Sequence, residues 1–544
     1  MSVVRKNIQW NRAGKYFRAE IKLELPPASS FCYVSNAMMS QVFPRPNLER
    51  VLDWTRDVFS TDVIVVGNDF ENRYVLAGAL TVFRSTTDFT AKMRNRTFVS
   101  VEMVQRYILP DEEPEETVIL EGDDWRELLI RYAKMAAQRM NVKKIPEREN
   151  LTGYCSWYYY YKNVTQKDFL ENLEALKNTS SSYYAQYVQI DDGYQTWQGD
   201  WLDCRKEWPG PLELVAEKIT ESGRKAGIWL MPFTASTASN VYKTHPDWFV
   251  HDEKGCLVTV QGWTPPPDDQ WACLDTTIPE VREHLKNVFV SFWKMGFSYF
   301  KMDALMYGLF EGVRRDKNAT PVSAFRLGLQ TIREAVPEAL LMACSSPLMP
   351  CMGLVDHIRV SNDTSRYFGT EKYENENFPR CSGADILSAI RVSLSHFWKF
   401  DRWFRCDPDV VMARQDNAFY SRNEAKFSVL GAVMTGITFT SDHFDTIAPD
   451  RLKLLEKAQK IRMRKVQPFI TSEAGLWPVL YEGEIRGRRA VAVFNDTRFA
   501  KKYTLAELEL PDCCMELLED TEIKDSFEIS AHNAMLLVEK IYEK

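Results

Sequence analysis

The sequence predicts an α/β protein: a (β/α)8 TIM barrel with an N-terminal antiparallel β-sandwich and a small C-terminal β domain. Short apolar runs alternate with amphipathic helical segments eight times between about residues 151 and 460, which matches a (β/α)8 barrel in number and size. The flanking regions contain β-branched and aromatic runs separated by turn-rich pieces, a pattern typical of antiparallel sheets. We place the three units at 1–145, 146–465 and 466–544.

The N-terminal region supplies the strands of the expected sandwich. The strand candidates are 16–25, 61–67, 73–83 and 97–109. A closing helix is expected after Asp123 or Asp124, either of which can cap it, because apolar residues from Trp125 to Ala133 follow at helical spacing. The charged segment 143–150 is expected to be the linker to the barrel.

The middle region carries the barrel elements. The expected strands are 153–161, 185–191, 227–233, 298–305, 339–345, 357–363, 402–409 and 437–443. Thr277 with Glu280 resembles a capping box, and 320–336 and 385–400 are predicted helices. Residues 240–275 interrupt the repeat as an elaborated loop. A doubly wound open sheet is the rival fold, but its Gly-rich phosphate turn is missing.

The C-terminal region returns to short strands. The candidates are 476–483, 488–496, 502–508 and 534–543. They predict the small terminal β domain.

Composition narrows the class of partner. The net charge of −7 over 544 residues does not favour a general nucleic-acid binder. No apolar run is long enough to span a membrane, and MSVVRKNIQW lacks the apolar segment of a signal peptide. The eleven cysteines show no zinc-site spacing. We therefore expect a cytoplasmic protein with reduced thiols and neither a metal nor a cofactor.

Acidic residues follow five of the eight expected barrel strands. They are Asp191 with Asp192, Asp303, Asp363, Asp407 with Asp409, and Asp442. Active sites of such barrels lie at the carboxyl ends of the strands, so these acids are expected to face one pocket. Trp157, Tyr194 and Trp229 lie at or just beyond strand ends and are expected to form stacking walls for a flat ligand.

Three chemistries are compatible with a ring of carboxylates. They are glycoside hydrolysis by a carboxylate pair, metal-assisted proton abstraction in a lyase or isomerase, and sugar binding without catalysis. Histidine is rare, seven in all, and only His443 lies near a strand end, which disfavours a metal site. The aromatic content of 12% favours a sugar.

Five ordered motifs add a family resemblance. GYCSWYYYY, QIDDGYQ, GIWLMPF, YFKMDAL and IRVSNDTSRYFG together resemble the α-galactosidases of glycoside hydrolase family 36, in particular the compact bacterial type. Their order and spacing agree over about 151 to 460. The resemblance implies a retaining, exo-acting α-galactosidase whose partner is a small-molecule or oligosaccharide substrate, with no nucleic-acid or membrane partner and the oligomeric state open.

The resemblance also implies roles for individual residues. Asp303 aligns with the catalytic nucleophile, Asp363 with the general acid/base, Asp191 and Asp192 with carboxylates that hold the C4 and C6 hydroxyls, Trp157 and Trp229 with pocket walls, Lys301 and Arg359 with hydroxyl-binding cations, and Cys344 with a residue beneath C2. The family's pocket tryptophan from the N-terminal domain has no counterpart, because the nearest segment, 33–43, contains no Trp. A related sugar therefore stays open: an α-N-acetylgalactosaminide, a β-L-arabinopyranoside or a modified galactoside.

Physical chemistry makes the two catalytic assignments sensible. Retaining hydrolysis needs two carboxyl groups about 5–5.5 Å apart, and the fourth and sixth strands are close enough for their ends to converge. Lys301, two residues away on the same strand face, favours the ionised form of Asp303. Burial and nearby carboxylates are expected to raise the pKa of Asp363. The plainer alternatives are an ion pair between Lys301 and Asp303 and a merely space-filling Cys344.

Overall fold

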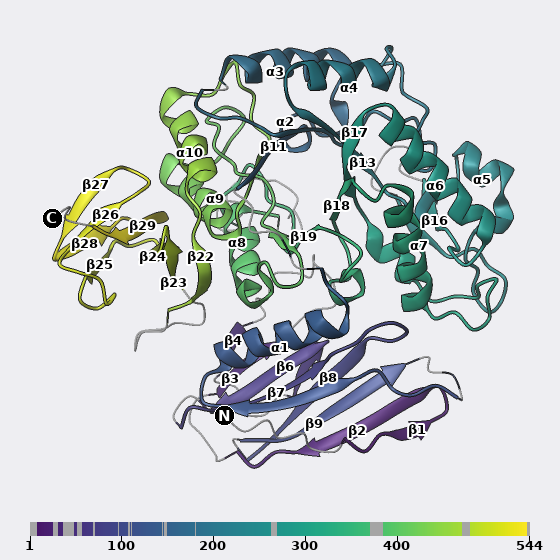
Figure 1. Ribbon diagram of the computed structural model, residues 1–544, viewed down its shortest axis with the longest axis horizontal. Helices are drawn as coiled ribbons and strands as arrows, with labels where there is room; N and C mark the ends of the chain where they lie inside the picture. The colour runs from purple at the N-terminus through teal and green to yellow at the C-terminus, as the bar shows by residue number, and fades with distance from the viewer. Residues whose placement is uncertain are drawn as a thin grey trace.

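The chain forms three regions that contain β-sheets: an N-terminal sandwich, a central barrel and a C-terminal pair of sheets (Figure 1). The computed structural model describes residues 8–25, 31–35, 48–51, 57–68, 71–95, 97–106, 109, 111–143, 145, 150–179, 181–262, 269–369, 384–469 and 479–540. The sandwich (purple) lies below the barrel, and the C-terminal sheets (yellow) lie to its left.

The central sheet is a nearly closed barrel of eight parallel strands. The strands are β11 (Leu151–Cys155), β12 (Tyr187–Ile190), β13 (Lys225–Leu230), β17 (Phe297–Met302), β18 (Leu340–Ala343), β19 (His357–Arg359), β20 (Arg405–Asp407) and β21 (Ile437–Thr440). Their order is β20-β19-β18-β17-β13-β12-β11-β21, and a bridge from Val411 to Thr440 brings the two ends together. The predicted barrel is therefore confirmed. Most strand residues are buried, as expected of parallel strands covered on both faces.

Helices between the strands cover the outside of the barrel. They are α3 (Gln166–Asn178), α4 (Leu212–Glu221), α6 (Pro279–Lys294), α7 (Pro321–Ala335), α8 (Ile386–Ser395), α9 (Arg422–Thr435) and α10 (Pro449–Lys460). Capping boxes start three of them, at Thr165, Thr320 and Ser421. Where an elaborated loop was expected, the structure has α5 (Asn240–Thr244) and a sheet of β14 (Thr234–Ser236), β16 (Gln270–Cys273) and β15 (Thr259–Gln261).

Two local predictions are wrong. The strand expected over 153–161 ends at Cys155, and the aromatic run continues as α2 (Trp157–Tyr160). Its backbone leaves the sheet because the amide of Tyr158 donates to the Ser441 hydroxyl (2.9 Å). The capping box at Thr277 does not form, since Ile278 is the N-cap of α6 and the Thr277 hydroxyl donates to Asp275 (2.7 Å).

The N-terminal region is an antiparallel sandwich of two five-stranded sheets. One sheet contains β1 (Asn11–Ala13), β2 (Tyr16–Lys22), β9 (Thr97–Arg106), β8 (Thr87–Arg94) and β5 (Val58–Thr61), and the other contains β10 (Thr117–Gly122), β7 (Arg73–Ala79), β6 (Val63–Asn68), β3 (Phe31–Ser35) and β4 (Leu48–Val51). Alternate side chains such as Ile64, Phe89 and Met103 form the core between them. Residues 36–43 and most of the expected linker 143–150 lie outside the described ranges.

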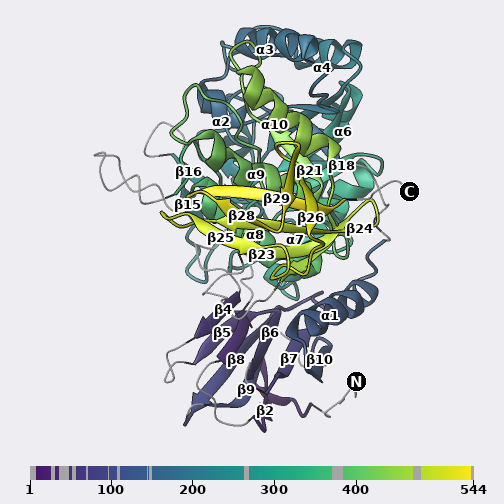
Figure 2. The ribbon, with the colours of Figure 1, turned by 90° about the vertical axis from the view of Figure 1, so that its left-hand side faces the viewer.

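Helix α1 (Trp125–Arg139) lies between the sandwich and the barrel in Figures 1 and 2. Asp124 caps it by accepting from the amide of Arg126 (2.8 Å), as predicted. The Tyr132 hydroxyl lies 2.8 Å from the Ala79 carbonyl oxygen of the sandwich. On the other side, the indole of Trp403 donates to the Ala133 carbonyl (3.0 Å). The helix therefore joins the two regions through buried hydrogen bonds.

The C-terminal region packs against α9 (Figure 2). Its six-stranded sheet contains β22 (Arg464–Pro468), β23 (Leu480–Ile485), β24 (Arg488–Asn495), β29 (Asn533–Glu539), β26 (Cys513–Glu516) and β27 (Thr521–Lys524), and β25 (Lys501–Thr504) pairs with β28 (Ser526–Ile529). Phe427 of α9 meets Phe494 of β24 with ring centroids 5.3 Å apart. We propose 1–145, 146–465 and 466–544 as the three units, with β22 crossing the second boundary.

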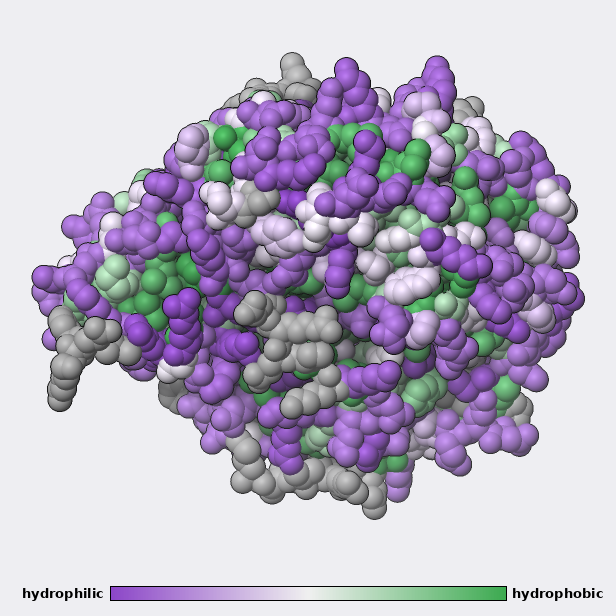
Figure 3. All heavy atoms as spheres, turned by 45° about the horizontal axis from the view of Figure 1, so that its top comes forward, coloured by the Kyte–Doolittle hydropathy of each residue, from purple (hydrophilic) through white to green (hydrophobic). Residues whose placement is uncertain are grey.

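The face in Figure 3 is mainly hydrophilic, and its hydrophobic atoms lie in small separate groups. None of the helices within the described ranges is long and apolar enough to cross a lipid bilayer.

Replacing Tyr132 by Phe tests the role of α1. The change removes the only donor that this side chain offers to the buried carbonyls of Asp62 and Ala79, so the free energy of unfolding should fall by about 1–3 kcal/mol. Tyr16, which is exposed in β2, gives the matched control, and Tyr16→Phe should change it by less than about 0.5 kcal/mol. Equal effects of the two changes in urea unfolding would contradict this role.

Candidate active site

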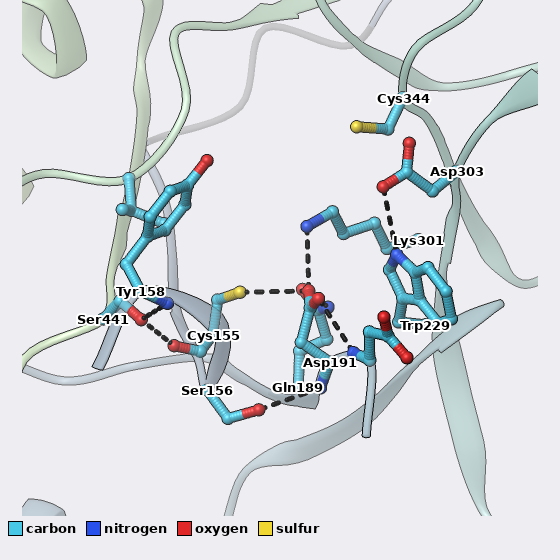
Figure 4. Close-up of polar contacts among 12 residues, drawn as sticks. Cys155, Ser156, Tyr158, Gln189, Asp191, Trp229, Lys301, Asp303, Cys344 and Ser441 are labelled. Carbon is cyan, nitrogen blue, oxygen red and sulfur yellow. Dashed lines mark hydrogen bonds and ion pairs between the residues drawn. The ribbon is translucent and has the colours of Figure 1, made fainter. Parts of the chain in front are cut away.

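The predicted site residues gather at the carboxyl ends of neighbouring barrel strands. Asp191 and Asp192 follow β12, Trp229 lies in β13, Lys301 lies in β17 with Asp303 just after it, Cys344 follows β18, Arg359 ends β19, Asp363 lies four residues further on, and Trp157 begins α2. In Figure 4 the side chains of Cys155, Lys301, Asp303 and Cys344 point into one common space.

Asp303 is held by hydrogen bonds on both carboxylate oxygens. Its Oδ1 accepts from the Ser345 hydroxyl (2.7 Å) and from the Ala304 amide (2.7 Å). Its Oδ2 accepts from the indole of Trp229 (3.1 Å; Figure 4). The Asp303 amide donates to the Leu230 carbonyl (2.8 Å), so strand β13 fixes the backbone. Oδ2 has one described donor and keeps acceptor capacity for another group.

Two residues around Asp303 have left-handed backbones. Ala304 has φ +50° and Ser345 has φ +44°. Non-glycine residues adopt this region at a cost of about 1–3 kcal/mol and do so most often at functional sites. Here the Ala304 turn directs its amide, and the Ser345 turn its hydroxyl, to the same oxygen of Asp303.

The surroundings favour the ionised form of Asp303. Burial alone would raise its pKa, but the positive charges of Lys301 and Arg359 and the donors from Ser345 and Ala304 together hold the pKa below its usual value. The side chain is nevertheless only partly buried. Asp303 is therefore an accessible carboxylate that stays charged.

Asp363 has the opposite tendency. Burial is the largest cause that raises its pKa above the usual value, the negative charges of Asp409 and Asp303 add to it, and Arg359 opposes them. Arg359 Nη2 lies 2.6 Å from Asp363 Oδ1. With 45% of its side chain exposed, Asp363 is open to the solvent side. The site thus contains one acid that favours the charged form and one that favours the proton.

Lys301 pairs with Asp191 and not with Asp303. Its ammonium donates to Asp191 Oδ2 (2.8 Å), and the two side chains are 7% and 2% exposed. The same oxygen accepts from Gln189 (2.7 Å) and lies 3.3 Å from the Cys155 sulfur. The alternative of an ion pair between Lys301 and Asp303 is therefore wrong. Lys301 acts on Asp303 through the field of its charge, from two residues away at the end of the same strand.

Asp192 combines one engaged and one unpartnered oxygen. Its Oδ1 accepts from Gln195 (2.6 Å), whereas its buried Oδ2 has no hydrogen-bond donor among the described residues. Burial raises its pKa to about 6, the Gln195 hydrogen bond opposes this, and the charges of Asp191 and Asp303 add to it. Such an oxygen can accept from a ligand hydroxyl at low desolvation cost.

The aromatic side chains divide into two groups. Trp229 meets Trp201 edge to face at 5.9 Å and donates to Asp303, and Trp157 meets Tyr161 at 5.4 Å. Tyr194, expected as a stacking wall, is fully buried, as Trp229 itself is, and the Tyr194 hydroxyl donates to the Trp229 carbonyl (3.1 Å). That expectation is wrong, because Tyr194 packs in the core behind Trp229.

Asp442 does not share the ring of acids. It is fully buried, accepts from the Thr440 hydroxyl (2.8 Å) and lies 3.9 Å from the Arg414 guanidinium. Arg414 in turn donates to the Tyr158 carbonyl (2.8 Å). Asp442 therefore supports the backbone of α2. His443, its neighbour, lies 5.0 Å from the ring of Tyr159.

Cys344 is fully buried beside the acids (Figure 4). Burial and the charges of Asp303 and Asp363 raise the pKa of its thiol well above the ordinary value, against Arg359 and Lys301. The group is therefore a small neutral thiol. Within the described ranges, no three or more His, Cys, Asp and Glu side chains come together in a way that could hold a metal ion.

Sequence reasoning missed the side chains that orient the acids. Gln189 and Cys155 hold Asp191, Ser345 holds Asp303, and Tyr158 donates to Asp409. A signal existed for Gln189 and Asp191, because alternate residues of one strand face the same way. None existed for Tyr158 and Asp409, which lie 251 residues apart.

The structure is a (β/α)8 barrel with two accessible acids at the ends of its strands. One acid favours the ionised form and the other the protonated form, and buried cations and tryptophan side chains lie beside them. Several known proteins to which this chain is similar are α-galactosidases. A sequence model of the melibiase family matches residues 165–347. The α-galactosidase AgaA of Geobacillus stearothermophilus is 23% identical over 145 residues, which cover 25% of this chain and 19% of that one.

Other curated relatives match over similarly short stretches. The α-galactosidase Mel36A of Lactobacillus acidophilus is 29% identical over 22% of this chain and 17% of its own length. The α-galactosidase of Escherichia coli is 26% identical over 38% of this chain and 28% of its own length. The aligned parts thus span at most 28% of the length of these relatives.

Solved structures match over nearly the whole chain. The α-galactosidase of Thermus thermophilus, in complex with p-nitrophenyl α-D-galactopyranoside, superposes with a TM-score of 0.68 at 22% identity and covers 88% of this chain and 92% of that one. The family 36 α-galactosidase AgaA of Geobacillus stearothermophilus superposes with a TM-score of 0.60 at 13% identity and covers 97% of this chain and 78% of that one. The chain therefore has the fold of the family 36 α-galactosidases, and the resemblance seen in its motifs is confirmed.

Replacing Lys301 by Met tests the buried pair. Asp191 would keep its charge without its cation, so the free energy of unfolding should fall by about 3 kcal/mol or more. The double variant Lys301→Met, Asp191→Asn should regain part of this loss. The exposed pair Lys177–Glu174 is the control, and Lys177→Met should cost less than about 1 kcal/mol. Denaturant unfolding decides, and a Lys301→Met loss no larger than that of Lys177→Met would contradict a buried ion pair.

Proposed function

We propose that the chain is a retaining, exo-acting α-galactosidase that cleaves terminal α-galactosides through a covalent glycosyl-aspartate intermediate. The observation that carries the proposal is the pair of partly exposed acids, Asp303 and Asp363, whose pKa values are shifted in opposite directions around Arg359. A retaining glycosidase needs one carboxylate that attacks and one carboxylic acid that protonates the leaving oxygen.

In the first step Asp303 Oδ2 would attack the anomeric carbon while Asp363 passes its proton to the glycosidic oxygen. The bond from carbon to the leaving oxygen breaks, its electron pair stays on that oxygen, and an ester to Asp303 forms. In the second step the ionised Asp363 takes a proton from water, whose oxygen attacks the same carbon and releases the sugar and the Asp303 carboxylate. Both steps balance without a cofactor.

The remaining side chains would bind the sugar. Asp192 Oδ2 offers an unpartnered acceptor, and Asp191 lies beside it with its charge balanced by Lys301. Carboxylates in fixed positions accept from adjacent hydroxyls, which suits the C4 and C6 hydroxyls of galactose. Trp229 and Trp157 would form the walls, Arg359 would bind a hydroxyl, and the small Cys344 would lie beneath C2.

The relatives support the choice of substrate. The Thermus thermophilus enzyme is described in complex with stachyose, and a variant of the Geobacillus enzyme in complex with raffinose, which are oligosaccharides with terminal galactose. We propose a substrate of this class here. A cytoplasmic location is also proposed, since none of the nine cysteines whose side chains are described forms a disulfide.

Asp303→Ala gives the direct test of the reaction. Hydrolysis of 4-nitrophenyl α-D-galactoside should fall by about 10³-fold or more, because the nucleophile is lost. Wild type should release α-galactose first, as observed by proton NMR, and should prefer this substrate over the N-acetylgalactosaminide and arabinopyranoside analogues. Activity should survive dialysis against EDTA. Equal rates for both proteins, or β-galactose as the first product, would contradict the proposal.

The pH dependence of kcat/KM follows from the two pKa shifts. Activity requires Asp303 ionised, so the acidic limb should lie below about pH 4, the ordinary range for Asp. Activity also requires Asp363 protonated, so the basic limb should lie above the ordinary Asp range. Asp363→Asn should remove the basic limb. A basic limb that persists unchanged in this variant would show that another group donates the proton.

A further inference from the structure

Asp409 lies two residues after β20, and its carboxylate contacts three residues that lie near Asp363. Its Oδ2 accepts from the Thr364 amide (2.9 Å) and from the Tyr158 hydroxyl, and it lies 3.5 Å from Arg359 Nη1. Its Oδ1 accepts from the Val410 amide (2.8 Å). The side chain is 5% exposed, so it does not reach the solvent side of the site.

These contacts connect Asp409 to Asp363 by two routes. Thr364 directly follows Asp363 in the chain, so the hydrogen bond to its amide fixes the backbone that carries the acid. Arg359 is shared, with one nitrogen 2.6 Å from Asp363 and another 3.5 Å from Asp409. The charge of Asp409 therefore offsets part of the positive field that Asp363 experiences.

The backbone of Asp409 supports a functional reason for this arrangement. Its φ is +74°, a left-handed conformation that costs free energy for a residue with a side chain. Its amide donates to Asp407 (2.7 Å), and the turn brings the carboxylate against Thr364 and Arg359. The Tyr158 hydroxyl stays protonated and so remains a hydrogen-bond donor to Asp409, because burial and the nearby charges of Asp363 and Asp409 raise the pKa of its phenol well above the ordinary value.

We propose that Asp409, held by the hydroxyl of Tyr158, is a positioning residue that shares Arg359 with Asp363 and thereby lets Asp363 keep its proton until the leaving oxygen takes it. The inference rests on the proposed retaining mechanism and deepens it. Without Asp409, Arg359 would pair with Asp363 alone and favour its ionised form, in which it cannot act as the acid.

Other titratable and charged groups also face Asp363. They are Arg359 of β19, Lys301 of β17, Asp303 after β17, Cys344 after β18, Asp409 after β20 and Tyr158 of α2. Both cations favour ionised Asp363, and Asp303 opposes them while it is charged. During the first step the Asp303 charge is consumed as its ester forms, so Asp409 is then the remaining carboxylate among these groups.

The test compares proton-dependent with proton-independent substrates. Methyl α-D-galactopyranoside has a poor leaving group and needs the acid, whereas 2,4-dinitrophenyl α-D-galactopyranoside does not. For Asp409→Asn, kcat/KM should fall about 100-fold on the methyl galactoside and less than about tenfold on the dinitrophenyl galactoside. The basic limb of the pH profile should move to lower pH by about one unit.

Tyr158→Phe is the second variant, in case Asp409→Asn does not fold. It should lose activity selectively on the methyl galactoside, by about tenfold. The matched control is Tyr159→Phe, since Tyr159 is the next residue of α2 and also donates to an aspartate, Asp416, at 2.9 Å. This control should keep the wild-type profile.

Three outcomes separate the two proposals. Losses that are equal on both substrates, with an unmoved basic limb, would overturn the role of Asp409 and leave the proposed function intact. The same holds if Tyr158→Phe behaves like Tyr159→Phe. A wild-type protein that hydrolyses neither galactoside would overturn the proposed function itself.

Discussion

The candidate site depends on two buried cations, Lys301 and Arg359, that balance the charges of several carboxylates. Lys301 is bound by Asp191, and Arg359 lies between Asp363 and Asp409. Asp303 has no direct ion pair with either cation, yet it lies in the field of both. Its pKa is therefore lowered while its Oδ2 keeps acceptor capacity. A direct ion pair would stabilise the charge equally well but would occupy the oxygen that attacks in the proposed mechanism.

The barrel is what makes this sharing possible. Parallel strands bring their carboxyl ends to one edge, so side chains from β12, β17 and β19 meet although they are far apart in the chain. The supporting contacts come from loops with unusual backbones, such as Ala304 and Ser345. The strain stored there is balanced by the packed strands beneath them, which hold the site in one geometry before a ligand arrives.

Much of this fold was predictable because its signals are local. Short apolar runs and helical periodicity identify the eight strands and most of the helices. The aromatic run at 157–161 was misassigned because composition favours a strand, whereas the Ser441 hydroxyl takes the Tyr158 amide away from the sheet. The helix start at Pro279 was missed because the Thr277 hydroxyl is already engaged by Asp275, a contact that spacing does not reveal.

The sequence identifies candidate residues for the site but not how these residues pair. Positions at strand ends make Asp303, Asp363 and Asp191 candidates, since the carboxyl ends of the strands meet at the mouth of the barrel. Which carboxylate takes Lys301 depends on distances across the barrel, and the sequence placed it beside Asp303 because the two lie on one strand. Asp442 carries the same local signal as the others, but a partner from the preceding loop, Arg414, takes it out of the ring.

The most direct measurement is to trap the intermediate. The protein would be incubated with an activated 5-fluoro-galactosyl fluoride, and the labelled peptide identified by mass spectrometry. We expect one adduct per chain, an ester on Asp303, formed as activity is lost. An adduct on a different residue, or loss of substrate without any adduct, would contradict a covalent mechanism centred on this carboxylate.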